Sequence, residues 1–168
     1  MPTLKELTQE NHRRAERTAF VAAMMKNQLS SQQWADYLVW KRDLLVILDR
    51  KLELKQSHPE FDRVHQFDGD ILETGVSPRE LQSSQAYNEH IKNLDDRQAW
   101  AHVYVHYLGD LRGGQMLRRM VQLPMAHVDY ADKEAIESVI RDHVDESLSD
   151  EANRAFELTM AVMEEIMR

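Results

Sequence analysis

Apolar residues recur along most of the chain at the three- and four-residue steps of an α-helix. One clear run begins at a cap, Ser30 or Ser31, and stops near Leu54, and its apolar face comprises Trp34, Leu38, Leu45, Leu48 and Leu52. A stripe with this period predicts an amphipathic helix that buries one face. No segment alternates apolar and polar residues as a strand would, so the pattern predicts an all-α fold.

Capping signals mark further helices. Thr3 followed by Glu6 has the form of a capping box, which predicts a first helix running to about Lys26. The segment Ser77-Pro78-Arg79-Glu80 combines a serine cap, a first-turn proline and a glutamate, and it predicts a helix to about Leu94. Residues 57–77 contain one proline and two glycines, so we expect irregular chain with one short helix there.

A helix is also predicted from Asp95 or Asp96 to the residue before Pro124. Its periodic apolar and aromatic positions are Trp100, Tyr104, Tyr107, Leu108, Leu111, Leu117 and Val121. Two more helices are predicted, one from about Tyr130 to Val144 and one from a cap at Ser149 or Asp150 to the C-terminus.

Composition narrows the class of protein. A length of 168 residues, 42% of them hydrophobic, predicts a single domain spanning residues 1–168. The formal net charge of -8 argues against nucleic acid as a partner, and the absence of cysteine excludes disulfides and thiolate metal sites. No transmembrane stretch or secretory signal is recognisable, so we expect a soluble, cytoplasmic protein without a membrane partner.

Three of the five glycines, Gly109, Gly113 and Gly114, fall inside the helix that follows Asp95. Each glycine in a helix costs about 0.5–1 kcal/mol relative to alanine, so we expect the cluster to bend the helix and to be offset by packing or by function. Gly109 and Gly113 lie on one face, where the missing Cβ atoms would admit either another helix or a flat ligand. Asp110 lies beside that opening. Spacing alone leaves both alternatives open.

Two separated segments resemble the heme oxygenase family. Residues 104–115, Tyr-Val-His-Tyr-Leu-Gly-Asp-Leu-Arg-Gly-Gly-Gln, are similar to the family's distal-helix signature. Residues 4–8 and 12–20 resemble its proximal-helix segment, and residues 151–156 are a weaker echo of its last core helix. The resemblance implies a heme-oxygenase-like helical bundle that binds heme between a proximal N-terminal helix and a glycine-kinked distal helix.

On the proximal side, the resemblance implies that His12 is the heme-iron ligand, which leaves the opposite axial position for dioxygen. Glu16 follows one helical turn later, where its carboxylate can orient the imidazole. Without the family context, a lone histidine in the polar run around His12 is more often a surface residue, and the alternative for Glu16 is a solvated helix carboxylate.

On the distal side, the resemblance implies that Gly109 and Gly113 place backbone against the bound heme and oxygen. Asp110 would hold the water that supplies protons during oxygen activation. Tyr104 is expected to join the pocket, with a core aromatic as the alternative. For the heme propionates, the resemblance points to Lys5 and, less directly, to Arg141, although both are also ordinary surface charges. Phe156 matches an aromatic that walls the pocket, but an amphipathic helix would bury a phenylalanine there in any case.

The chain departs from the family pattern at three positions near these motifs: Gln9 in place of lysine, His106 in place of arginine and Thr159 in place of asparagine. It is also shorter between Val128 and Ser149. These departures put propionate anchoring in doubt, and with it the meso carbon that would be cleaved.

The resemblance implies an enzyme that consumes heme, dioxygen and electrons and yields biliverdin, ferrous iron and carbon monoxide. No flavin or iron–sulfur motif is present, so the electron donor would be a separate protein such as a ferredoxin or a reductase. A local basic patch could receive it, with Arg13, Arg14, Arg118 and Arg119 as candidates.

Three other functions remain open from the sequence. The first is a heme-binding carrier or sensor of the same fold that does not turn heme over. The second is a non-heme metal oxygenase using His102, His106 and Asp110, which are spaced at four-residue steps. The third is an interaction module that docks a partner through Met160, Met163 and Met167, although methionine stripes usually fill cores.

Overall fold

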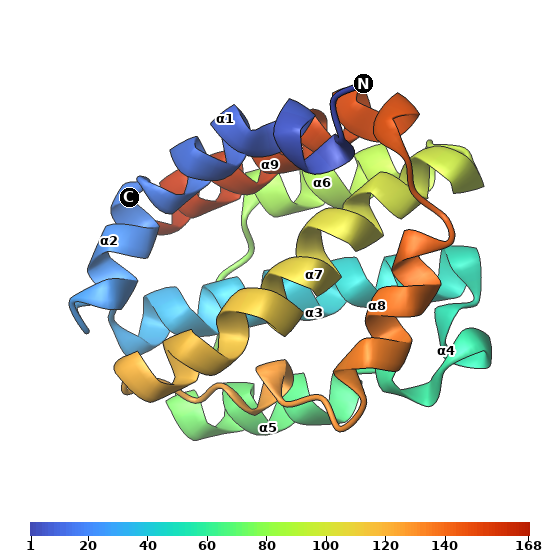
Figure 1. Cartoon of the computed structure of the whole chain (residues 1–168). Helices are drawn as coiled ribbons and strands as arrows, with labels where there is room; N and C mark the ends of the chain where they lie inside the picture. Colours follow the sequence, from blue (N-terminus) through green and yellow to red (C-terminus); the bar gives the residue numbers. More distant parts are fainter.

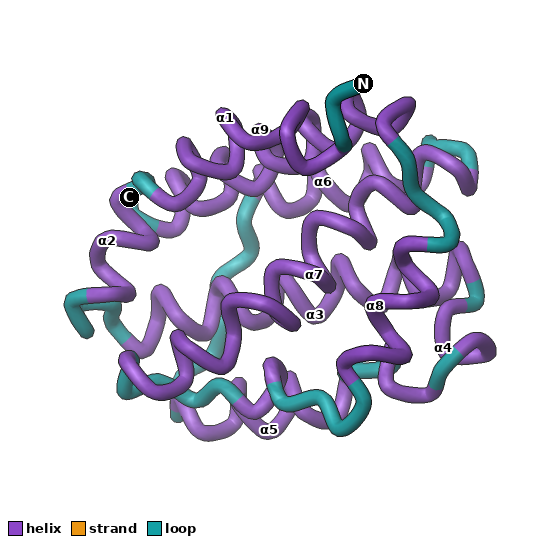
Figure 2. The backbone as a smooth tube through the Cα atoms, in the orientation of Figure 1, coloured by secondary structure: helices purple, strands orange, loops and turns teal.

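A computed structural model describes all 168 residues as helices joined by short loops, with no strands (Figures 1 and 2). The α-helices are α1 (Leu4–Glu16), α2 (Ala19–Met25), α3 (Ser31–Leu52), α4 (Leu54–Ser57), α5 (Val64–Thr74), α6 (Gln82–Lys92), α7 (Asp96–Met120), α8 (Lys133–Arg141) and α9 (Ser149–Ile166). Short 3₁₀ turns are formed by Pro59–Phe61, Ala126–Val128 and Glu146–Leu148. The all-α prediction is confirmed, and no helix is long and apolar enough to cross a bilayer.

The helices α1 and α9 form one layer at the top of the molecule in Figure 1, and α3 and α7 cross the middle below them. Asn11 of α1 donates to Asn153 of α9 at 3.1 Å, and Thr18, just after the end of α1, contacts Met163 further along α9. The two helices therefore run in the same direction. Helix α7 packs against α3, α8 and α9.

The core follows the predicted stripe of α3. Trp34, Leu38, Leu45 and Leu48 are buried, and Leu52 packs against the same cluster. Trp34 also donates from its indole nitrogen to the Pro124 carbonyl at 2.9 Å, which fixes the chain just after α7. Met163 belongs to this core, and Met167 packs against it. Their burial supports core packing for these methionines over a docking stripe.

The first predicted helix is divided in the structure. The Thr3–Glu6 capping box is present, but α1 ends at Glu16, and Thr18 starts α2 by accepting from the Val21 amide. A continuous helix to Lys26 was therefore wrong. A threonine at this position can satisfy free amides of a new helix, and that local bond competes with helix continuation.

The predicted start of a helix at Ser77 is also wrong, because α6 begins only at Gln82. The Arg79 amide and guanidinium both donate to Asp36 of α3, which holds this segment extended. The carboxylate of Glu165, on α9, then accepts from the amides of Gln82 and Ser83 and caps α6. The carboxylates of Asp36 and Glu165, both distant in sequence, thus place the start of α6 at Gln82 instead of Ser77.

Other boundaries differ in smaller ways. Residues 57–77 are more ordered than expected, since α5 has 11 residues and includes Gly69. Helix α8 is shorter than the predicted 130–144 span, and a 3₁₀ turn rather than a Ser149 or Asp150 side-chain cap precedes α9. Asp95 caps α7 as predicted by accepting from the Gln98 amide, and α7 stays helical through its three glycines.

Candidate functional site

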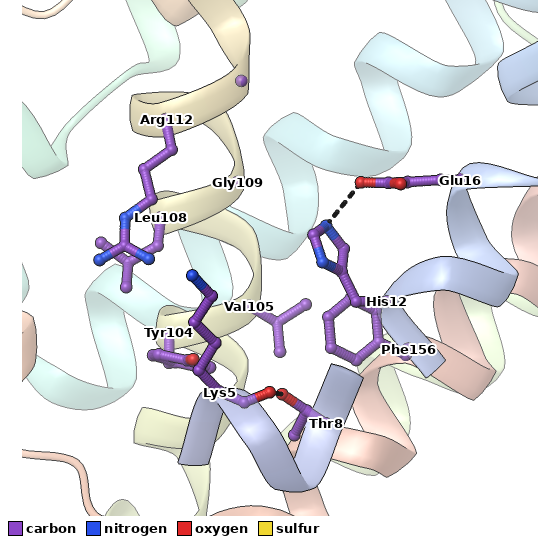
Figure 3. A pocket seen from close by; sticks show the side chains of 11 residues that line it. Lys5, Thr8, His12, Glu16, Tyr104, Val105, Leu108, Gly109, Arg112 and Phe156 are labelled. Carbon is purple, nitrogen blue, oxygen red and sulfur yellow. Dashed lines mark hydrogen bonds and ion pairs between the residues drawn. The ribbon is translucent and has the colours of Figure 1, made fainter. Parts of the chain in front are cut away.

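A cavity of about 330 Å³ lies between α1, α7 and α9 (Figure 3). Its lining residues are Lys5, Thr8, His12 and Glu16 from α1, Tyr104, Val105, Leu108, Gly109, Arg112 and Gly113 from α7, and Phe156 from α9. Seven of the nine predicted site residues are therefore brought together around one space, although they lie in three separate parts of the chain.

The α1 wall presents His12 and Glu16 on one face, one turn apart. His12 Nε2 lies 3.0 Å from a Glu16 carboxylate oxygen, and both side chains are about half exposed, at 52% and 62%. The His12 ring also packs against Phe156 with ring centroids 5.8 Å apart. The imidazole thus faces the cavity with an aromatic support on one side and a carboxylate on the other (Figure 3).

The α7 wall is open where its glycines lie. A Cβ added to Gly109 or Gly113 would meet no atom within 4 Å, so no neighbouring helix requires glycine at these positions. Gly114 differs, because a Cβ there would lie 2.6 Å from the Cβ of Val128. One glycine therefore permits close packing, and the other two leave bare backbone facing the cavity.

Cationic side chains stand at the cavity rim. Lys5 is exposed, and Arg112 bonds to Glu137 of α8 at 3.0 Å while remaining 43% exposed. Tyr104 of α7 lies beside Lys5 (Figure 3); burial raises the pKa of Tyr104, and the nearby Arg112 opposes that rise. The rim can thus receive an anionic group beside an aromatic hydroxyl.

Asp110 and Arg141, the other two predicted site residues, do not line the cavity. Arg141 lies on α8, where it approaches the opposite oxygen of Glu137 at 3.8 Å, so Glu137 links it to Arg112. Asp110 follows Gly109 but is buried, and its Oδ1 lies 3.5 Å from Lys41 Nζ of α3.

The environment of Asp110 is polar and incompletely bonded. Its Oδ2 is buried without a hydrogen-bond partner, as is the hydroxyl of Tyr130, and the Asp110 charge contributes to raising the pKa of Tyr130. Burial by itself lowers the pKa of Lys41, but Asp110 and Tyr37 outweigh it and leave that pKa raised, so Lys41 stays charged. An unpartnered carboxylate oxygen of this kind is a binding position for an ordered water.

The alternative metal set of His102, His106 and Asp110 does not form. The Tyr87 hydroxyl lies between the two imidazoles, 2.7 Å from His102 Nδ1 and 2.8 Å from His106 Nε2, and Asp110 is paired with Lys41 instead. His106 also lies 3.4 Å from Thr159. Two departures from the family pattern therefore meet in one buried polar network.

Four lining residues were not singled out from the sequence: Thr8, Val105, Leu108 and Arg112. Their helical spacing from His12 and Gly109 is the signal that could have placed them on the same faces. Arg112 in particular lies one turn from Leu108 and beside Gly113, so it follows from the geometry of α7 once the glycine face is taken as a wall.

The chain is similar to known proteins over most of its length. The family model described as "Heme oxygenase" matches residues 1–146. The chain belongs to the heme oxygenase family. Heme oxygenase of Takifugu rubripes is 24% identical over 73% of this chain and 50% of that protein, and heme oxygenase 2 of Rattus norvegicus is 26% identical over 97% and 64%. The chain thus spans about half to two thirds of the length of these curated relatives.

Solved structures of the family share the fold. Heme oxygenase-1 of the cyanobacterium Synechocystis, in complex with heme, superposes with a TM-score of 0.81 at 23% identity and covers 97% of this chain and 90% of its own. Heme oxygenase from Leptospira interrogans gives a TM-score of 0.80 at 22% identity, with coverage of 96% and 97%. The predicted single-domain heme-oxygenase-like bundle is confirmed.

Proposed function

We propose that this chain is a heme oxygenase that binds heme in the α1–α7–α9 cavity and cleaves it to biliverdin, with release of ferrous iron and carbon monoxide. The observation that carries the proposal is the cavity itself, which sets an accessible imidazole on α1 opposite side-chain-free backbone on α7. A flat macrocycle with a central metal needs both features, and a cavity lined only by bulky side chains would supply neither.

In this proposal His12 binds the iron, and Glu16 orients the imidazole. The present contact uses His12 Nε2, so ligation through that nitrogen requires the ring to turn and present Nδ1 to Glu16. The half-exposed positions of both side chains allow this turn. A carboxylate that accepts from the second imidazole nitrogen fixes the ring and increases its basicity as a ligand.

The residues at the rim fit the substrate's charge. Heme carries two propionates, and Lys5 with Arg112 offers cations at the open edge of the cavity, with Arg141 held nearby through Glu137. Arg112 is already held by Glu137, so a propionate would compete with that carboxylate or share the guanidinium. Phe156 and Leu108 would contact the apolar ring system.

Bound heme supplies both the iron that activates dioxygen and the carbon that becomes oxidised. The chain contributes space and protons. Bare backbone at Gly109 and Gly113 leaves room for dioxygen over the ring, and Asp110 holds a water on its unpartnered Oδ2 for proton delivery. Lys41 places a positive charge beside the other oxygen of Asp110, because Asp110 and Tyr37 raise the pKa of Lys41 more than burial lowers it.

Electrons come from a separate protein in this proposal, since the chain has no redox motif of its own. Arg13, Arg14, Arg118 and Arg119 are all exposed and remain the candidate docking cations. Arg118 already forms an ion pair with Asp129 at 2.8 Å, so a docking partner would compete with that carboxylate. A ferredoxin or a reductase with an acidic docking surface would complement these cations.

The test is heme titration of the purified chain, followed by reduction under air. Wild type should bind one heme, and His12→Ala should lose the imidazole-ligated spectrum. Asp110→Asn should bind heme like the wild type yet yield little biliverdin. A wild-type complex that stays unchanged under reductant and air would instead identify a heme carrier, and failure to bind heme would refute the proposal.

A further inference from the structure

A second cluster of metal-binding side chains lies outside the cavity, where α6, α7 and α9 meet (Figure 1). One oxygen of Glu151, Oε2, accepts from His90 Nε2 at 2.8 Å and from His102 Nε2 at 2.7 Å. The three ligand atoms lie within 4.8 Å of one another. None of the three residues lines the candidate heme cavity, so the cluster is a separate feature of the fold.

We propose that His90, His102 and Glu151 bind one zinc ion, with water as the fourth ligand. Two imidazoles and a carboxylate are a donor set that Zn²⁺ favours, and three protein ligands leave one tetrahedral position for solvent. Solvent can reach that position, because the His90 and Glu151 side chains are 27% and 15% exposed, whereas His102 is fully buried. The site therefore has one fixed ligand and two that can adjust.

The geometry requires only a small expansion. In a tetrahedral zinc site with ligand distances of about 2.0–2.2 Å, neighbouring ligand atoms stand roughly 3.4 Å apart. The present nitrogen–oxygen distances of 2.7 and 2.8 Å are those of hydrogen bonds. Zinc takes the place of the two Nε2 protons, each of which moves to Nδ1 of its own imidazole, and His90 and Glu151 each need to move outward by a fraction of an ångström, toward solvent.

Charge also suits a cation. Burial alone raises the pKa of Glu151, but hydrogen bonds from His102 and His90 outweigh it and hold that pKa below its usual range. Burial lowers the pKa of His102, so this imidazole is neutral and can act as a ligand. The cluster therefore offers a negatively charged carboxylate beside the neutral imidazole of His102.

Zinc at this site would reverse a chain of hydrogen bonds in the core. Without metal, His102 must donate from Nε2, because an ionised carboxylate only accepts; its Nδ1 then accepts from Tyr87, and Tyr87 accepts from His106. With zinc on Nε2, the His102 proton moves to Nδ1 and donates to Tyr87. The Tyr87 hydroxyl then donates to His106 Nε2, and the His106 proton moves to Nδ1.

This relay changes no net charge in the core, because each proton moves within its own residue. It ends at His106, one helical turn before Asp110 on α7. Zinc binding at the surface is thus coupled to hydrogen-bond direction on the buried face of the helix that also forms the cavity wall.

The experiment is a calorimetric titration of the heme-free full chain with Zn²⁺. Wild type should show a site of unit stoichiometry, and His90→Gln should weaken it by at least about tenfold, since one of three protein ligands is lost. His65→Gln is the matched control, because His65 is an exposed histidine on α5, away from the cluster. The control should bind zinc like the wild type.

Nitrogen-15 spectra of the histidine rings test the same proposal in the unmodified chain. Zinc should exchange the protonated and unprotonated nitrogens of His102 and of His106. Equal zinc affinity in wild type and His90→Gln, or zinc that perturbs only the exposed His12 beside Glu16, would overturn the proposal. Because no heme is present, this result is independent of the proposed oxygenase activity.

Discussion

Replacing Gly109 with leucine should stabilise the fold and prevent heme binding at the same time. Leucine is a much better helix former than glycine, so the substitution should raise the free energy of unfolding by about 0.5–1 kcal/mol. A Cβ at this position would meet no atom within 4 Å, and the position lines the cavity, so we expect the side chain to enter open space without offsetting this gain. For a chain of this size, the melting temperature should rise by roughly 1–4 °C.

Two controls separate this effect from general properties of glycine. Gly69→Leu also places its Cβ in open space within a helix, α5, and it should give the same rise in melting temperature while leaving heme binding intact. Gly114→Ala should instead lower the melting temperature, because its Cβ would stand 2.6 Å from Val128, and overpacking costs about 1–3 kcal/mol.

The assay is thermal unfolding of each heme-free variant, followed by heme titration monitored by absorbance. Gly109→Leu should weaken heme binding by at least about tenfold, equivalent to 1.4 kcal/mol. Heme affinity equal to that of Gly69→Leu would show that the cavity is not the heme site. A fall in the stability of heme-free Gly109→Leu would show that the glycine is required by packing.

Three further predictions concern stability. Lys41→Met should lower the free energy of unfolding by about 3–5 kcal/mol in urea titrations, since it leaves Asp110 buried without its partner; adding Asp110→Asn should recover most of the loss, and no recovery would argue against the pair. Asp70 is buried and hydrogen-bonded to His127 at 2.8 Å. Burial raises the pKa of Asp70, but its hydrogen bonds, those with His127 foremost, outweigh burial and lower that pKa overall. Asp70 therefore stabilises the fold fully above its unfolded-state pKa of about 3.9, and this stabilisation is lost as the pH falls through the lower folded-state pKa. Asp70→Asn should flatten the acid limb of the plot of unfolding free energy against pH, and an unchanged acid limb would count against this role. Glu165→Ala should cost about 1 kcal/mol, or roughly 2–4 °C in a thermal melt, because it removes the cap of α6, whereas an unchanged melt would assign that cap no energetic role.

Local patterns in the sequence were sufficient to place most helices. The stripe on α3 and the Asp95 cap of α7 are both signals carried within a few residues, and both elements occur as predicted. One of the failures has the opposite character. The start of α6 depends on Asp36 and Glu165, which are distant in sequence, so no local pattern around Ser77 could have revealed it.

The candidate site shows the same division. The resemblance brought together residues such as His12 and Gly109, which the fold places around one cavity. It did not reveal the pairing of Asp110 with Lys41, because the two residues are 69 positions apart and their proximity depends on how α7 crosses α3. Nor did it show that Glu137 binds Arg112, which requires the position of α8.

The central claim is that the chain cleaves heme in this cavity. Its most direct test is a single turnover of the heme-loaded chain under air with an electron donor, measuring carbon monoxide and biliverdin per heme in wild type and Asp110→Asn. We expect about one of each per heme in the wild type and little of either in the variant, with heme binding unchanged. Heme that is bound but never cleaved by the wild type would contradict it.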